Sequence, residues 1–227
     1  MLPNIPYGLE MSITFPISRK MAFAPPQVHT GGFTFTNGYL LRNPSGCLAV
    51  DAPDGMADWL ERLGVKLNAL LLTHWHFDHV MDAARLAREH RCPVYAWGPS
   101  TPETRLEEHL KQWAGIAISV EEYPVDHLLA GQTELSVAGH EFQLEHVPGH
   151  SPDSVVFIET AAARVFSGDT LMQDGIGRSD FPDGDGGLLI QGIKDKILTL
   201  PANYAVFSGH GRPTTVGAEK AGNPFLC

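Results

Sequence analysis

Short apolar runs separated by turn residues recur along most of this chain. Residues 33–43 and 46–53 each have the apolar pattern of a strand, and the turn sequence NPSG between them predicts a hairpin. Residues 68–73 form a continuous apolar run, which is typical of a strand buried on both faces. Residues 93–97 predict a further strand. The first half of the chain therefore predicts a sheet built from these segments.

Helices are expected between and after these strands. Residues 56–64 predict a short helix that ends at Gly64. Residues 80–90 repeat apolar side chains at helical spacing, and residues 102–115 begin with proline and glutamate, as helices often do. Strands that alternate with helices in this way are typical of βαβ units.

The second half of the chain changes to consecutive strands. These strands are expected at 133–139, 141–149, 154–160 and 163–169, followed by a helix at 187–201 and a last strand at 204–210. Mixed βαβ units and a meander predict an α/β fold in which two mixed sheets pack on each other and helices cover their outer faces.

The domain organisation follows from the same pattern. Residues 31–227 contain no linker-like break, so we expect one domain there. Residues 1–30 are rich in proline and are expected to form an extended lead-in, with one strand at 12–17.

Composition narrows the class of protein. Of the 227 residues 43% are hydrophobic and 19% are charged, which suits a folded enzyme rather than a disordered chain. The formal net charge is −10 and no cluster of lysine or arginine is present, so nucleic acid is not an expected partner. No apolar stretch approaches the ~18 residues of a membrane helix, and the N-terminus lacks the pattern of a secretory signal.

The cysteines indicate the compartment. Cys47, Cys92 and Cys227 are odd in number and show no CxxC spacing, which argues against a disulfide framework. We therefore expect a reducing, cytoplasmic setting without a membrane partner. No apolar stripe indicates an obligate interface, so the sequence leaves the oligomeric state open.

Side chains of the kind that bind metals follow four of the predicted strands. They are His74, His76, Asp78 and His79 after residues 68–73, His150 after 141–149, Asp169 at the end of 163–169, and His210 at the end of 204–210. Because α/β folds commonly build their sites at strand ends, we expect these side chains to converge. Such ionisable groups are costly to bury unless they are paired or bind a metal.

The types of ligand indicate a catalytic metal centre. Five imidazoles and two carboxylates, with no thiolate, suit zinc, with iron or manganese as alternatives. Seven ligands exceed what one tetrahedral ion uses, so we expect two divalent ions, and one aspartate could bridge them. Two neighbouring ions would hold a hydroxide and lower its pKa toward neutrality, which gives a nucleophile at physiological pH.

Four motifs carry a resemblance to a known family. THWHFDH at 73–79, PGHSPDS at 148–154, FSGDTL at 166–171 and FSGHG at 207–211 resemble the successive motifs of the metallo-β-lactamase superfamily. GIGRSDFPDGD at 175–185 and the tail at 209–226 are similar to its glyoxalase II-like (hydroxyacylglutathione hydrolase-like) branch, including the short bacterial forms. The resemblance covers residues 33 to 226.

The resemblance implies an αββα sandwich and a ligand assignment. It implies a first metal on His74, His76 and His150, a second on Asp78, His79 and His210, and Asp169 as the bridge. It also implies that Arg178 binds substrate, because a basic residue at this place in glyoxalase II-like enzymes helps to hold glutathione. An ordinary surface arginine is the alternative.

The reaction that the resemblance favours is hydrolysis of a thioester, typified by the glutathione-linked small molecule S-lactoylglutathione. Metal-bound hydroxide would attack the carbonyl, and Asp78 would be both a ligand and the catalytic residue that orients the hydroxide. Full-length glyoxalase II carries a C-terminal helical domain that supplies glutathione contacts. Only a short tail follows His210, so binding would depend on Arg178 and nearby loops, or the acyl donor would differ.

Three alternatives stay open. A sulfur (persulfide) dioxygenase has a GRxDF stretch like that at 177–181 and uses a single iron at the positions of His74, His150 and Asp169. A lactonase or β-lactamase-like hydrolase shares the metal machinery and opens a ring. A non-enzymatic metal-binding protein on the same scaffold is the third, and the complete ligand set argues against it.

The remaining polar candidates have simpler interpretations. Isolated histidines are usually surface residues or satisfied core residues, and this is what we expect of His29, His90, His109, His127 and His140. His146 is expected to be a hydrogen-bonding neighbour of the site. Asp51, at another strand end, is expected to cap a turn rather than to fix a ligand histidine.

Overall fold

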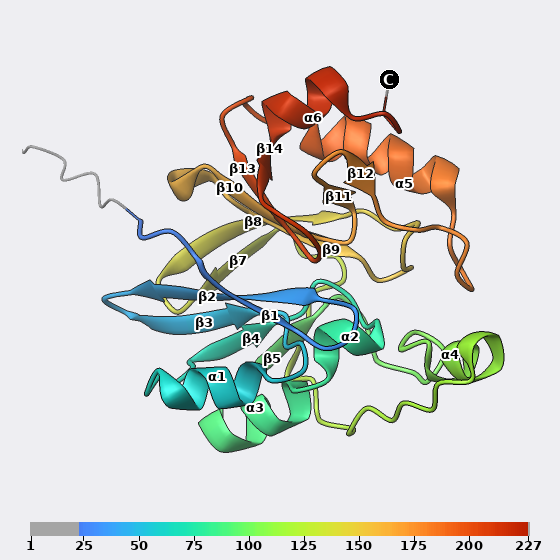
Figure 1. Ribbon diagram of the computed structural model, residues 1–227. Coiled ribbons are helices and arrows are strands. Elements are labelled where there is room, and N and C mark those ends of the chain that lie inside the picture. The colour runs from blue at the N-terminus through green and yellow to red at the C-terminus, as the bar shows by residue number, and fades with distance from the viewer. Residues whose placement is uncertain (1–22, 227) are drawn as a thin grey trace, which may run out of the picture.

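Two mixed sheets pack face to face in the computed structural model of the protein, which describes residues 23–226. Figure 1 shows the two sheets as stacked layers, with α5 and α6 outside one sheet and α1 and α3 outside the other. This arrangement confirms the predicted αββα sandwich. The strand expected at 12–17 lies outside the described residues.

The N-terminal sheet has six strands in sequence order. They are β1 (Gln27–Gly31), β2 (Thr36–Asn43), β3 (Gly46–Val50), β4 (Ala69–Leu71), β5 (Val94–Ala96) and β6 (His127–Leu128). The first three strands pair antiparallel, and β3 to β6 pair parallel. Because β3, β4 and β5 run parallel, their C-terminal ends meet at one edge of the sheet.

The second sheet has the strand order β14-β13-β10-β9-β8-β7. Its strands are β7 (Glu134–Val137), β8 (His140–His146), β9 (Val155–Glu159), β10 (Arg164–Gly168), β13 (Ala205–Ser208) and β14 (Thr214–Thr215), and β11 (Leu171–Met172) and β12 (Gly175–Ile176) form a separate hairpin. Only β10 and β13 pair parallel among the described strands of this sheet, so these two also end at the same edge.

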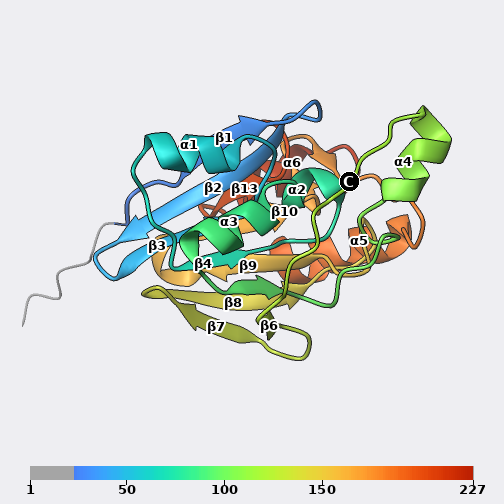
Figure 2. The same cartoon turned by 90° about the horizontal axis from the view of Figure 1, so that it is seen from below.

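Helices cover the outer faces, α1 and α3 on one side and α5 and α6 on the other (Figure 1). The helices of the described residues are α1 (Met56–Arg62), α2 (Phe77–Val80), α3 (Ala83–His90), α4 (Glu107–Ala114), α5 (Gly186–Gly192) continued by a π-helical turn (Ile193–Ile197), and α6 (Val216–Gly222), with a 3₁₀ turn at Thr160–Ala162. Figure 2 shows α1 and α3 lying across the first sheet and α4 standing off from the body. Within residues 23–226 no helix has the length and apolar character needed to cross a bilayer.

The apolar runs of the sequence are strands buried on both faces. In β9, Val155 and Phe157 pack between the sheets, whereas Val156 and Ile158 pack under α5. Leu70 and Leu71 of β4 divide in the same way between the helix layer and the space between the sheets. Burial of each such side chain stabilises the folded state by about 1.5–3 kcal/mol. The packed layers therefore hold the strand ends in place.

Several elements differ from the prediction. The helix expected over 80–90 begins only at Ala83, after the separate short helix α2, and the helix expected over 102–115 begins at Glu107. Strand β1 overlaps the end of the predicted lead-in and pairs with β2. The pattern did not predict α6, whose sequence VGAEKAG has two glycines and little apolar periodicity.

Candidate metal centre

The ends of four strands bring the predicted metal-binding side chains together. The loop after β4 carries His74 and His76, and α2 carries Asp78 and His79. His150 follows β8, whereas Asp169 and His210 follow β10 and β13. The two sheets therefore face each other across the site, and each contributes ligands from its own strand ends.

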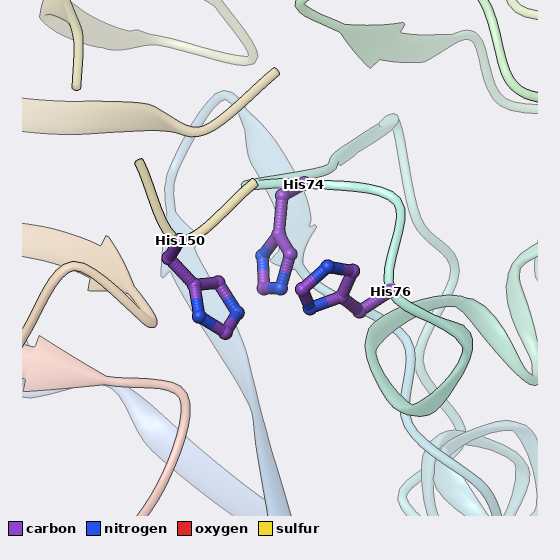
Figure 3. Close-up of side chains that lie close together, drawn as sticks. All are labelled: His74, His76 and His150. Carbon is purple, nitrogen blue, oxygen red and sulfur yellow. The ribbon is translucent and has the colours of Figure 1, made fainter. Parts of the chain in front are cut away.

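Three histidines form the first group, which comprises His74, His76 and His150. Each offers a ring nitrogen, and these nitrogens lie within 4.8 Å of one another. All three side chains are buried, and Figure 3 shows their rings converging on a common point. This geometry could hold one metal ion.

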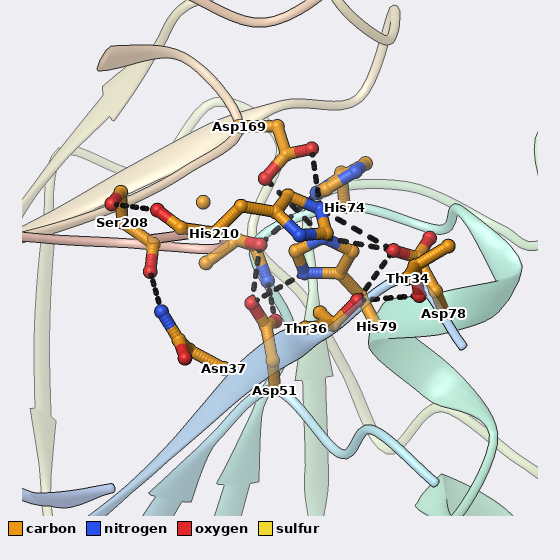
Figure 4. Close-up of polar contacts among 12 residues, drawn as sticks. Thr34, Thr36, Asn37, Asp51, His74, Asp78, His79, Asp169, Ser208 and His210 are labelled. Atoms are coloured by element: carbon orange, nitrogen blue, oxygen red, sulfur yellow. Dashed lines mark hydrogen bonds and ion pairs between the residues drawn. The ribbon is translucent and has the colours of Figure 1, made fainter. Parts of the chain in front are cut away.

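The second group comprises Asp78, His79 and His210, whose ligand atoms also lie within 4.8 Å of one another. The Nε2 atom of His210 is 3.4 Å from Oδ2 of Asp78. Figure 4 shows this group beside Asp169, with the carboxylates facing the imidazole rings. A second ion could therefore be held next to the first group.

Asp169 lies between the two groups. Its Oδ1 is 3.4 Å from Nε2 of His79, and its Oδ2 is 3.2 Å from Nε2 of His210 and 3.5 Å from Nε2 of His150. It also forms a possible three-ligand set with His74 and His79. One carboxylate in contact with both groups has the position that a bridging ligand requires.

Unpartnered atoms test whether the site suits a metal. The buried Nε2 atoms of His74, His79 and His150 and the Oδ1 atom of Asp169 have no hydrogen-bond partner among the described residues. Buried polar atoms without a partner are costly, and imidazole nitrogen and carboxylate oxygen are common ligands of divalent cations. The residues of the site therefore fit metal ions.

Hydrogen bonds on the far side of the rings fix which nitrogen faces the site. Nδ1 of His79 lies 2.8 Å from Oδ2 of Asp51, and Nδ1 of His150 lies 2.7 Å from the carbonyl oxygen of Arg178. Nδ1 of His74 lies 3.1 Å from Oγ1 of Thr73. When Nδ1 carries the proton, Nε2 is left with a lone pair for a metal.

Asp51 corrects the interpretation favoured from the sequence. It accepts hydrogen bonds from the backbone N–H and the hydroxyl of Thr73, as a turn-capping aspartate would, but it also contacts His79. Its backbone adopts the left-handed region, with φ of 61°. Asp51 therefore orients a histidine of the site, which was the less favoured of the two sequence interpretations.

The two groups have different electrostatics. Burial holds the pKa of His74, His76 and His150 below the ordinary histidine value, and the neighbouring imidazoles lower the pKa of His74 and His76 further. Burial also opposes protonation of His79 and His210, but the surrounding carboxylates raise the pKa of both, that of His210 to about 10. Without metal, the imidazoles of the first group are thus neutral, whereas those of His79 and His210 are protonated.

The carboxylates of the site are ionised. Burial alone would raise the pKa of Asp78 and Asp169, but the charge of His79 and the hydrogen bond with His210 hold both well below the ordinary value. Oγ1 of Thr36 also donates a 2.6 Å hydrogen bond to Oδ2 of Asp78. No sequence motif marked Thr36, which lies on a strand far from Asp78 in the chain.

Close packing at the site explains why the FSGHG motif has a glycine at position 209. A Cβ atom built on Gly209 would lie 2.1 Å from Oδ1 of Asp169 and 2.5 Å from Cε1 of His79. No side chain can be accommodated at such distances without displacing these two residues. The glycine therefore allows the β13 end to pass close behind the site.

Arg178 lies on the wall of a cavity that opens in front of the candidate metal ligands. The cavity has a volume of about 370 Å³, and its lining includes Arg178 together with His76, His150 and Asp169. The guanidinium group makes two hydrogen bonds to Asp180, of 2.9 and 2.8 Å, and stacks over Phe181 at 4.5 Å. These two bonds use Nε and Nη2 of the guanidinium group.

The isolated histidines lie outside the three possible metal sets. His29 stacks on Trp59, His127 stacks on Tyr95, and His140 pairs with Glu159. His146 lies 2.8 Å from the carbonyl oxygen of Pro152, in the loop that leads from His150 into β9, and stacks on Trp97.

Comparisons with known proteins agree with this geometry. The model of the metallo-beta-lactamase superfamily matches residues 31–210. The hydroxyacylglutathione hydrolase GloC of Haemophilus influenzae is 38% identical over 78% of this chain and 86% of its own length.

Two solved structures are similar as well. The BLEG-1 B3 metallo-beta-lactamase has a TM-score of 0.80 and 37% identity, covering 89% of this chain and 99% of its own. TTHA1623 in a di-iron-bound form has a TM-score of 0.77 and 36% identity, covering 88% of this chain and 100% of its own. With its fold, its cluster of potential metal ligands and these similarities, the chain belongs to the metallo-beta-lactamase superfamily.

Proposed function

We propose that this metallo-hydrolase cleaves a thioester, with a glutathione thioester such as S-lactoylglutathione as the first substrate to test. The observation that carries the proposal is the pair of three-ligand groups that share Asp169 at the floor of an open cavity. The identity of 38% to a hydroxyacylglutathione hydrolase supports the thioester.

We infer that His74, His76 and His150 hold one ion and that Asp78, His79 and His210 hold the other, with Asp169 between them. Zinc is the first expectation, and the di-iron form of a 36% identical protein makes iron the main alternative. When bound, such ions supply Lewis-acid chemistry that lowers the pKa of a water and polarises a carbonyl oxygen.

The residues of the chain then position the reactants. In the balanced reaction, water forms a C–O bond to the thioester carbon and the C–S bond breaks, which gives a carboxylate, a thiol and a proton. The Asp78 carboxylate, held by Thr36 at 2.6 Å, is proposed to orient the attacking water. Asp51 keeps the ring of His79 in place at 2.8 Å from behind.

Arg178 is proposed to contact the thiol part of the substrate. It is a basic residue on the cavity wall, and its partner Asp180 is well exposed to solvent. Exposed ion pairs contribute little stability, so a substrate carboxylate can replace Asp180 at small cost. The free thiols of Cys47 and Cys92 suit the cytoplasmic setting that we propose for the enzyme.

The experiment that tests the function is hydrolysis of S-lactoylglutathione by protein purified with its own metal, followed by loss of thioester absorbance. We expect turnover in the wild type and a loss of kcat of about 10²–10⁴-fold in Asp78→Asn. Asp58→Asn, which alters an exposed aspartate on α1, is the matched control and should retain wild-type turnover. Oxygen uptake with glutathione persulfide in the absence of thioester turnover would instead support the mononuclear iron dioxygenase.

Hydrolysis of a β-lactam ring is the second candidate, because a B3 metallo-beta-lactamase is 37% identical and covers 89% of this chain. Turnover of a chromogenic cephalosporin with a higher kcat/KM than any thioester would favour it.

A further inference from the structure

Apolar side chains dominate the lining of the cavity in front of the candidate metal ligands. They include Phe33, Phe77, Leu110, Trp113 and Ile116. Phe33 and Trp113 are 59% and 65% exposed, although both are large and apolar. Exposed apolar side chains that gather around a concave site mark a binding surface rather than random surface composition.

The cavity has two chemically different sides. Phe181 lies against the rings of His76 and His150, with centroid distances of 5.4 and 5.8 Å, so this side belongs to the three-histidine group. Phe33 stacks on Phe77 at 5.7 Å, and both line a smaller cavity together with Asp78. The Phe33–Phe77 side therefore belongs to the carboxylate-rich group.

Charge separates the two sides further. Arg178 is the one lysine or arginine among the described residues that line the cavity, and its guanidinium lies over Phe181 and Trp113. The polar neighbours of Phe33 and Phe77 in that lining are Thr34 and Asp78, and His210 lies 3.4 Å from Asp78. An anionic group would thus be attracted to Arg178 on the Phe181 side, whereas the Phe33–Phe77 side offers mainly apolar contact beside an acidic group.

A smaller cavity continues the apolar surface beyond Phe77. It has a volume of about 100 Å³ and shares Phe33, Phe77 and Asp78 with the larger one. Met81 and Ile118 add apolar lining, and Thr34 and Asp54 are its further polar lining residues. It has room for a few methylene groups and no basic residue to hold a carboxylate or phosphate.

We propose that the substrate is the thioester of a medium-length apolar carboxylic acid. This inference rests on the proposed thioester hydrolysis. The acyl chain lies along Phe33 and Phe77 toward the smaller cavity, and the polar thiol part lies toward Arg178. A lactoyl group, which is short and carries a hydroxyl, leaves the Phe33–Phe77 side unused, whereas every buried methylene adds binding free energy.

The test is a series of glutathione thioesters of straight-chain acids, from acetyl to octanoyl, with S-lactoylglutathione and the succinyl thioester as comparisons. With metal-replete full-length protein, we expect kcat/KM to rise about fourfold for each added methylene until the cavity is full. The succinyl thioester should be cleaved more slowly than the butyryl thioester.

The possible outcomes separate this inference from the function on which it rests. Turnover that is independent of chain length, or fastest with the lactoyl group, overturns the apolar acyl site and leaves thioester hydrolysis standing. A series in which no thioester is hydrolysed overturns both.

Two variants assign the two sides of the cavity. Phe33→Ala should reduce the gain per methylene, while Phe225→Ala removes a similarly exposed phenylalanine outside both cavities and should keep the wild-type series. Because Phe33 is exposed, its loss should leave the melting temperature nearly unchanged, which excludes unfolding as the cause. An unaltered chain-length dependence in Phe33→Ala overturns the proposal.

Arg178→Gln tests the opposite side. It should raise KM by the same factor for glutathione thioesters of every acyl length, and it should leave the thioesters of N-acetylcysteamine unaffected because that thiol lacks carboxylates. A change in the chain-length dependence instead would place the acyl group beside Arg178 and overturn the assignment of the sides.

Discussion

The two groups of potential ligands differ in what surrounds them. His74, His76 and His150 contact one another through their rings, at centroid distances of 4.4 to 4.9 Å, and burial keeps their pKa values low. His79 and His210 face Asp78 and Asp169, and their pKa values are raised. One group is built from neutral donors and the other from paired charges.

This difference indicates how each group would bind an ion. The three-histidine group needs no proton release, because its imidazoles are already neutral, whereas His79 and His210 must lose protons to bind. In return, the second group offers negative charge to a cation. The same fold thus places a neutral and a charged site side by side, with Asp169 in contact with both.

The largest effect on both ligand groups is expected from removing Asp169, the side chain that contacts both. In Asp169→Ala, we expect loss of metal from both groups and a fall in kcat/KM on the order of a thousandfold, because a bridging charge disappears from a buried site. Metal content by mass spectrometry and thioester turnover measure the two effects. Retention of both ions in this variant would contradict the bridging position.

A smaller change should separate the two groups. Asp51→Asn weakens the contact that orients His79. Asp51 reaches the three-histidine group only indirectly, through its hydrogen bonds with Thr73, whose hydroxyl lies beside His74. We expect the affinity for the ion of the second group (Asp78, His79 and His210) to fall about 10–100-fold, while the affinity for the ion of the three-histidine group is unchanged. Metal titration followed by calorimetry gives both affinities.

The matched control is Asp126→Asn. Asp126 also accepts a hydrogen bond from a backbone N–H, that of Val94 at the start of β5, but it lies outside the three metal-ligand sets. Equal weakening of both ions by Asp51→Asn, or the same effect in Asp126→Asn, would contradict the selective role of Asp51.

A milder effect is expected from Thr36→Val, which removes the 2.6 Å hydrogen bond to Asp78 and keeps every ligand. A hydrogen bond to a charged group contributes about 1.5–3 kcal/mol, so kcat should fall at least about tenfold with little change in metal content. Thr214→Val, which removes a threonine–carboxylate hydrogen bond to Glu219 elsewhere, is the control and should leave kcat unchanged.

The smallest expected effect is on stability and distinguishes the groups by pH. Without metal and below the ordinary histidine pKa of about 6.5, His74, His76 and His150 bind fewer protons in the folded protein than in the unfolded chain. The free energy of unfolding therefore falls as the pH drops below about 6.5. The raised pKa values of His79 and His210 act oppositely: their stabilisation is complete below about 6.5 and is lost as pH rises toward about 10.

The melting temperature of metal-free protein should therefore be highest near pH 6.5 and fall on the alkaline side by at least about 2–4 °C, the shift that 1 kcal/mol produces in a chain of this size. His210→Ala should flatten the alkaline side, whereas His127→Ala, which alters a residue outside the three metal-ligand sets, should not. A melting temperature that rises from pH 7 to 9 would contradict the charge assignment.

The fold was predictable where burial imposes a pattern. Strands such as β4 and β9 are apolar on both faces because a layer covers each side, and the sequence therefore showed continuous apolar runs. Very short strands such as β11 and β12 have too few residues to show a period. Strand β1 was hidden because its pattern of mostly exposed residues resembles a polar lead-in.

The candidate site was predictable where chemistry concentrates in sequence, and less so where it depends on tertiary contact. The HxHxDH cluster was visible because its donors are adjacent in the chain, and the structure brings the distant donors to the same place. The contacts of Asp51 with His79 and of Thr36 with Asp78 join residues 28 and 42 positions apart, and no local motif marks them. Likewise, the sequence did not show that Asp180 pairs with Arg178.

The number of metal ions that the enzyme needs can be measured by titrating metal-free protein with zinc, and separately with iron(II), while following hydrolysis of a glutathione thioester. We expect activity to rise to a plateau at two equivalents of metal per chain. Full activity at one equivalent, or no thioester hydrolysis at any metal content, would contradict the dinuclear thioesterase.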